Sequence, residues 1–182
     1  MPTGSLPLEA AGGSDSGGMT NLLRRAAALA AMSTALVGGA LIGTGPASAA
    51  TAPSTDATFE ARVVKLTNDN RVKNGCAAVR VEVKLTTAAR THSVDMVTKD
   101  YFSHTSTDGR TFLVRAKSAG YTGAIGENIA WGYRTPEAVV TAWMKSPGHR
   151  ANILNCKAKA VGVGLAKKAD GTPYWTQLFG SV

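Results

Sequence analysis

Apolar residues recur at helical spacing in three segments between residues 58 and 119. In residues 58–74 they stand three or four positions apart, and residues 82–99 repeat the pattern. Gly75 follows the first segment as a natural stop. A shorter apolar stretch covers residues 111–119 and ends at Gly120. We therefore predict three helices in this part of the chain. The inner positions of the two long ones are Phe59, Val63, Leu66 and Asn70, and Leu85, Ala89, His92 and Met96.

The last third of the chain alternates turns with strand-like runs. Residues 124–131 form an apolar run bounded by glycines, and residues 160–166 alternate valine or alanine with glycine. Asp170-Gly171 is a typical turn pair, and residues 174–179 follow it as a closing strand. The pattern predicts three strands, of which the last two are neighbours in the chain.

A fourth helix is predicted between the first two of these strands. Thr135 is a suitable N-cap, Pro136 fits the first helical position, and Glu137 lies in the positively polarised first turn. Ser146-Pro147-Gly148 ends this helix. Helices that come first and strands that come later indicate an α+β domain built in layers.

The first 49 residues differ from the rest and read as an N-terminal extension followed by a signal peptide. Arg24 and Arg25 precede an apolar run over residues 26–42, and Ala47-Ser48-Ala49 fits a small-x-small cleavage site. An uncleaved anchor is the alternative, although the run is short for a membrane span. The glycine- and serine-rich residues before Met19 are unusual in a leader, so we expect translation to start at Met19.

The remaining chain divides into a short linker, residues 50–57, and one domain, residues 58–182. A domain of this length is large enough for a real core. The whole chain is 44% hydrophobic and 18% charged, which argues against wholesale disorder. We find no phosphate-binding glycine loop and no His-Glu-x-x-His pair, which disfavours nucleotide chemistry and a standard zinc peptidase.

The domain is basic. The leader holds two of the 20 basic and two of the 12 acidic residues, so the rest of the chain keeps the net charge of +8. These charges are spread along the sequence, as on an ordinary solvated surface. The alternative is attraction to anionic cell-wall polymers or lipid headgroups. Nucleic acid is not an expected partner, because no basic stretch is interleaved with aromatic residues.

Two cysteines stand alone in the sequence, Cys76 and Cys156. In an exported chain such a pair most simply forms one disulfide. A catalytic thiol is the competing interpretation, but neither cysteine lies in a redox or nucleophile motif. We predict the disulfide.

Three polar residues could carry chemistry: His104, Glu127 and His149. Both histidines lie where a predicted helix ends, and Glu127 interrupts an apolar strand, where a lone charge is costly to bury. Two imidazoles and a carboxylate can bind zinc, or can transfer protons near neutral pH. An ordinary hydrogen-bonded polar cluster is the alternative. The three residues are more than 20 positions apart, so only the fold can bring them together.

Other candidate residues are better explained by packing. His92 shares a helix face with apolar residues and is predicted to be a hydrogen-bonded histidine in the core or at its edge. Of Trp131, Trp143 and Trp175, at least two are expected in the core, and an aromatic ligand groove is the alternative.

Several short motifs, which stand in order along residues 58–182, resemble those of one family. They resemble the bacterial branch of the CAP superfamily, which is named for cysteine-rich secretory proteins, antigen 5 and pathogenesis-related 1 proteins; this branch is also called the SCP domain. The matching residues are Leu66, Asn68, Arg71 and Gly75; Phe102-Ser103-His104; Gly126-Glu127-Asn128-Ile129-Ala130; Trp143 to Arg150 with Asn152-Ile153-Leu154; Val161-Gly162-Val163-Gly164; Trp175-Thr176-Gln177; and Phe179-Gly180.

The resemblance implies an α-β-α sandwich, extracellular life and a cleft with two histidines and two acidic residues. In some members this cleft binds a divalent metal such as zinc. By motif, His104 and His149 are the two histidines and Glu127 is the first acid. Glu137 is the nearest candidate for the second acid; a helix first-turn carboxylate is its alternative interpretation.

The sequence leaves three functions open. The first is a secreted, monomeric binding module for a lipid, sterol-like or anionic cell-wall ligand, which the family resemblance and the basic surface favour. The second is a metal-assisted hydrolase of peptide or cell-wall bonds, with His104, Glu127 and His149 as the candidate catalytic residues. The third is a structural or interaction domain without catalysis.

Overall fold

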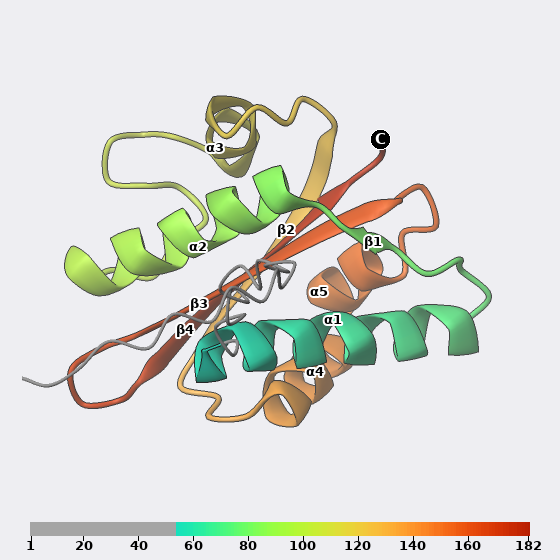
Figure 1. Ribbon diagram of the computed structural model, residues 1–182, viewed down its shortest axis with the longest axis horizontal. Helices are drawn as coiled ribbons and strands as arrows, with labels where there is room; N and C mark the ends of the chain where they lie inside the picture. The colour runs from blue at the N-terminus through green and yellow to red at the C-terminus, as the bar shows by residue number, and fades with distance from the viewer. Residues whose placement is uncertain (1–53) are drawn as a thin grey trace, which may run out of the picture. The chain divides into compact units, whose positions relative to one another are not determined.

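The computed structural model describes residues 54–182 (Figure 1). The predictions for the extension and signal peptide, and for linker residues 50–53, lie outside the described residues. The elements run in the order α1 (Thr55–Lys73), β1 (Arg80–Val81), α2 (Val83–Thr98), α3 (Phe112–Ser118), β2 (Ala124–Trp131), α4 (Pro136–Lys145), α5 (Pro147–Ile153), β3 (Ala160–Lys167) and β4 (Pro173–Gly180). None of the helices within residues 54–182 is long and apolar enough to cross a membrane.

The four strands form one mixed sheet in the order β1-β3-β4-β2. The short strand β1 runs parallel to β3, whereas β4 pairs antiparallel with both β3 and β2. The long strand β2 therefore lies at an edge of the sheet. A register shift between Ala124 and Gly126 marks an irregularity at the start of its pairing with β4.

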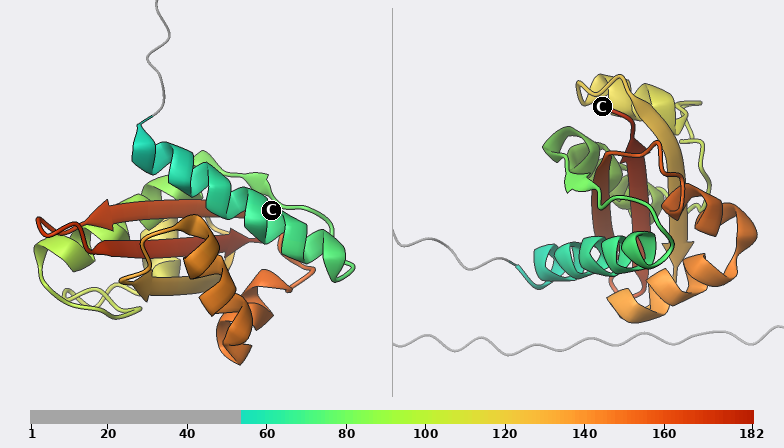
Figure 2. Two further views of the ribbon diagram at one scale, coloured as in Figure 1. Left: turned by 90° about the horizontal axis from the view of Figure 1, so that it is seen from below. Right: turned by 90° about the vertical axis from the view of Figure 1, so that its right-hand side faces the viewer.

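Helices cover both faces of the sheet, which confirms the predicted α+β sandwich. Successive strand residues point to opposite faces, so the sheet has two apolar sides. Helices α2 and α3 pack on one side, and α1, α4 and α5 pack on the other (Figures 1 and 2). The larger core lies on the α1 side and contains the sheet residues Val161, Val163, Leu165, Trp175 and Phe179.

Most elements begin and end within a few residues of their predicted positions. Helix α1 starts three residues earlier than predicted and takes in part of the predicted linker, because the Ser54 hydroxyl caps it by accepting a hydrogen bond from the amide of Ala57. Thr135 caps α4 in the same way, as predicted. Two elements were missed: β1, which has only two residues, and α5, which begins at the Pro147 that was expected only to end α4.

One end of the molecule is tied together by a disulfide and a buried arginine. Cys76 and Cys156 are bonded, as predicted, across 80 residues of sequence. Closing a loop of that length removes entropy from the unfolded chain worth about 4 kcal/mol. Beside this bond, the buried guanidinium of Arg71 donates to the backbone carbonyls of Ala77, Ile153, Asn155 and Ala158. Together they fix the segment between α5 and β3 against α1.

On the face of the sheet that α2 covers, two glycines of β3 let the helix approach closely. A Cβ atom at Gly162 would lie 2.2 Å from the backbone of Leu85, and one at Gly164 would lie 2.2 Å from the backbone amide of Arg90. These neighbours are helix backbone and cannot rotate away. The alternation of valine and glycine in β3 thus serves both layers, because the valines fill one core and the glycines admit the helix on the other side.

We expect Gly164→Ala to destabilise the protein by about 1–3 kcal/mol or more, because α2 must move away from the sheet. Gly148→Ala is the matched control, since no neighbouring atom lies within 4 Å of its Cβ position. Urea unfolding measures both variants. Equal stability of the two would contradict the close packing.

Candidate functional site

The centre of the candidate site is the carboxylate of Glu127 on β2. Its side chain is only 1% exposed, yet both oxygens have polar partners. Oε1 lies 2.8 Å from Nδ1 of His104, and Oε2 lies 2.6 Å from Nη2 of Arg115. The buried charge is thus compensated by a guanidinium and an imidazole, as the cost of burying an isolated carboxylate requires.

Arg115 of α3 also shapes the loop that carries His104. Its side chain is 2% exposed, and its Nη1 donates to the backbone carbonyls of His104 and Arg110 at 2.9 and 2.8 Å. The same nitrogen lies 3.2 Å from the hydroxyl of Ser106. Arg115 was not predicted as a site residue, because one arginine in a short helix carries no motif of its own.

The hydrogen bond to Glu127 fixes the proton position on His104. An ionised carboxylate can only accept, so Nδ1 of His104 is the donor. When the ring is neutral, its Nε2 therefore keeps a free lone pair. The side chain is 53% exposed, so this nitrogen can meet a ligand. A carboxylate that orients a histidine in this way is found behind both metal-binding and proton-transferring imidazoles.

The second histidine approaches from the other layer of the sandwich. His149 lies in α5, and its Nδ1 is 2.9 Å from the Ser146 hydroxyl. Its backbone carbonyl accepts a hydrogen bond from the side-chain amide of Asn128 on β2. Burial, with a smaller contribution from the nearby positive charge of His104, lowers the pKa of His149 below its usual value. The fold thus brings the three predicted residues together around β2.

Side-chain amides join α5 and α1 to this part of the sheet. Asn152 donates to the carbonyl of Glu127 and to the side-chain oxygen of Asn128. Asn128 in turn donates to Gln177, which donates to the Thr67 hydroxyl of α1. Because Asn128, Gln177 and Thr67 are fully buried and mutually bonded, the backbone beneath the site is held rigidly.

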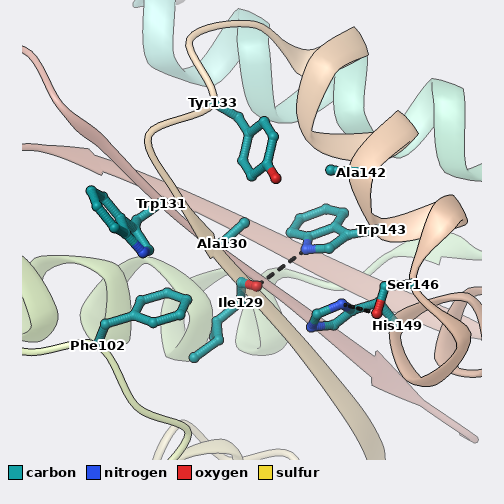
Figure 3. Close-up of a pocket in the computed structure, with 9 residues that line it drawn as sticks. All are labelled: Phe102, Ile129, Ala130, Trp131, Tyr133, Ala142, Trp143, Ser146 and His149. Carbon is teal, nitrogen blue, oxygen red and sulfur yellow. Dashed lines mark hydrogen bonds between the residues drawn. The ribbon is translucent and has the colours of Figure 1, made fainter.

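An aromatic groove extends from His149 along the outer edge of β2. Its cavity has a volume of about 410 Å³ (Figure 3). Ser146 and His149 form the polar side, and the apolar wall contains three exposed aromatic rings, Phe102, Trp131 and Tyr133. Trp143 and Trp175 are buried, as expected for two of the three tryptophans. The remaining lining residues are Ile129, Ala130, Ala142 and Trp143.

Glu137 does not join this cluster. It lies in the first turn of α4, where its Oε1 forms an exposed ion pair with Nε of Arg62 at 2.7 Å. Within residues 54–182 no three histidine, cysteine or acidic side chains are grouped as metal ligands. Both oxygens of Glu127 are bonded already. The donors therefore fit neither a closed zinc site of four protein ligands nor an open site of three, and metal binding stays a prediction.

The family is shown by comparison with known proteins. Residues 64–179 match the model of the cysteine-rich secretory protein family, CAP. The chain belongs to this family. Two similar curated relatives come from Bacillus subtilis strain 168: the protein YkwD is 44% identical over 130 residues, and the membrane protein YlbC is 36% identical over 124 residues. These alignments cover 70% and 67% of this chain but only 49% and 34% of the relatives, so the chain spans half of their length or less.

Two solved structures share the fold. An extracellular protein containing a SCP domain from Bacillus anthracis is 29% identical, with a TM-score of 0.64, over 69% of this chain and 41% of that one. An outer surface protein from Borrelia burgdorferi is 22% identical, with a TM-score of 0.60, over 65% and 88% of the two chains. The second likeness concerns the fold alone.

His92 supports the site from below, in the core position predicted for it. It is fully buried, and its Nε2 donates to the backbone carbonyl of Ser103, next to His104. Its Nδ1 has no hydrogen-bond partner among the described residues. Burial and the positive charge of Arg115 lower the pKa of His92, although the negative charges of Glu127 and Asp95 act in the opposite direction.

This lowered pKa makes stability depend on pH. Below the pKa of an unfolded histidine, about 6.5, the unfolded chain binds a proton that native His92 resists, so acidification favours unfolding. Because of His92, we expect the free energy of unfolding to fall by up to about 1.4 kcal/mol for each pH unit below 6.5. Above about pH 6.5 we expect no effect of His92. Chemical denaturation of wild type and His92→Gln between pH 5 and 8 measures this difference. Parallel curves for the two proteins would contradict it.

Proposed function

We propose that the protein is a secreted binding module, whose aromatic groove holds the apolar part of a lipid, sterol-like or cell-wall ligand. The observation that carries this proposal is the placement of the aromatic side chains. Within residues 54–182, the large aromatic residues that are exposed are Phe102, Trp131 and Tyr133, and all three line one groove. Exposed apolar rings that gather in a concave site are typical of ligand recognition.

The form of the groove supports a ligand with an apolar body and a polar end. The rings of Phe102 and Trp131 lie on one side in Figure 3, and Ser146 and His149 lie on the other. Tyr174 packs beneath both Phe102 and Trp131, with ring centroids 6.3 and 6.4 Å away, and holds them in place. A volume near 410 Å³ is within the range of small-molecule sites.

We also propose that the protein is exported and acts at the cell envelope. The leader of residues 1–49 directs the chain out of the cell, and similar solved structures come from an extracellular and an outer surface protein. The net charge of +8 would add attraction to anionic wall polymers or headgroups. Because the relatives are longer, any partner of their other regions is a separate question.

We expect Trp131→Ala to weaken binding about tenfold or more, because buried aromatic residues contribute most to such contacts and Trp131 is the most exposed of the three rings before a ligand covers it. The probes are purified peptidoglycan sacculi and phosphatidylglycerol vesicles, in sedimentation assays at 0.5 M salt to suppress general charge attraction. Leu113→Ala is the control, since this leucine is 51% exposed on α3 and does not line the groove. Equal binding by both variants would contradict the proposal. If the wild-type protein binds neither probe, a structural or interaction role is favoured.

A hydrolase is the second candidate function, and the hydrogen bond between Glu127 and His104 is the observation that favours it. A histidine oriented by a carboxylate can remove a proton from water or a substrate hydroxyl. His104 does not line the groove, so its removal separates catalysis from binding. For a binding module, we expect His104→Ala to change sacculus binding less than about twofold. Release of soluble wall fragments by the wild type, lost in His104→Ala, would establish the hydrolase instead.

A further inference from the structure

The carboxylate that orients His104 already has a cation beside it. The guanidinium of Arg115 lies 2.6 Å from Glu127, and the two side chains are 2% and 1% exposed. A guanidinium stays protonated at any pH the protein meets. The charge of Glu127 is therefore balanced permanently from within the chain, before any ion could arrive.

The same contacts make the carboxylate a poorer metal ligand. Glu127 already presents Oε2 to Arg115 and Oε1 to His104, so a metal ion would have to share or displace one of these partners. The donors that remain are the Nε2 atoms of His104 and His149, because each ring uses its Nδ1 for another bond. Two imidazoles fall short of the three protein ligands that even an open zinc site normally has.

Electrostatics acts in the same direction. A divalent ion beside Glu127 would lie close to a positive group that is itself shielded from water. Repulsion between like charges is several times stronger in such surroundings than in bulk water. Moving Arg115 away is also costly, because the carbonyl of His104 would lose its side-chain donor and the carbonyl of Arg110 would lose one of its two donors.

We infer that Arg115 takes the place of a metal ion as the positive partner of Glu127, so that His104, Glu127 and His149 form a metal-free site. The polar end of the groove is then the imidazole of His149 with the Ser146 hydroxyl, and these groups hydrogen-bond a ligand directly. A second consequence is that a carboxylate in place of Arg115 converts the cleft into a divalent-metal site with two acids and two histidines.

Calorimetric titration with zinc chloride tests this inference, using the disulfide-bonded protein. The chain has three histidines, of which His92 is buried, and both cysteines are bonded, so His104 and His149 are the natural zinc donors. We expect wild-type zinc binding to be weaker than about 100 µM in Kd. We expect Arg115→Glu to bind zinc at least about tenfold more tightly, and to lose that gain when combined with His104→Ala.

Two further variants keep the test independent of folding. Lys117→Glu makes the same charge change at an exposed position of α3, and we expect it to behave as the wild type. Arg115→Gln frees Glu127 without adding a carboxylate, and we expect it to bind zinc more tightly than the wild type. This variant provides the test if Arg115→Glu folds only with zinc. Micromolar zinc binding by the wild type, lost in His104→Ala, would overturn the inference. Folded Arg115 variants that bind zinc no better than the wild type would also overturn it.

Discussion

The site depends on one constraint, the burial of the Glu127 carboxylate within a β-sheet. A charge in that position requires compensation, and the chain supplies it with Arg115 and His104. Removing one partner of such a buried pair typically costs about 3–5 kcal/mol. The same bonds place α3, orient the loop that carries His104 and set the proton position on its ring. Stability and site geometry therefore have a common origin.

The edge position of β2 explains why a groove forms where it does. An edge strand exposes backbone groups, and proteins usually protect them. Here Trp143 of α4 donates to the carbonyl of Ile129, and Asn152 of α5 donates to that of Glu127. The elements that cover this edge also place His149 and Ser146 across the groove from Phe102 and Trp131. The groove is thus the part of the β2 edge that the two layers of helices leave uncovered.

The family relationship and the fold were predictable because short stretches of the sequence indicate them directly. The helical spacing around Leu85 and Met96 and the valine–glycine alternation of β3 each have a direct physical cause in the sandwich. Two elements were hidden because they lack such a pattern: β1 is two residues long, and the proline and glycine of α5 resemble a helix end.

The site was only partly predictable, because its chemistry arises between elements. The motifs identified His104, Glu127 and His149, but not the arginine that neutralises Glu127. Arg115 stands in an ordinary helical stretch, and its role depends on a fold that brings α3 against β2. Glu137 looked like a second acid by position, yet the packing of α4 against α1 gives it Arg62 as a partner.

The proton position on His104 tests this account most directly. The nitrogen chemical shifts and long-range proton couplings of the His104 ring, measured by NMR at pH 8, distinguish the two neutral tautomers. The account predicts a proton on Nδ1, where Glu127 accepts it, and a lone pair on Nε2. Glu127→Gln should remove this preference. A proton on Nε2 in the wild-type protein would contradict the arrangement from which the site has been derived.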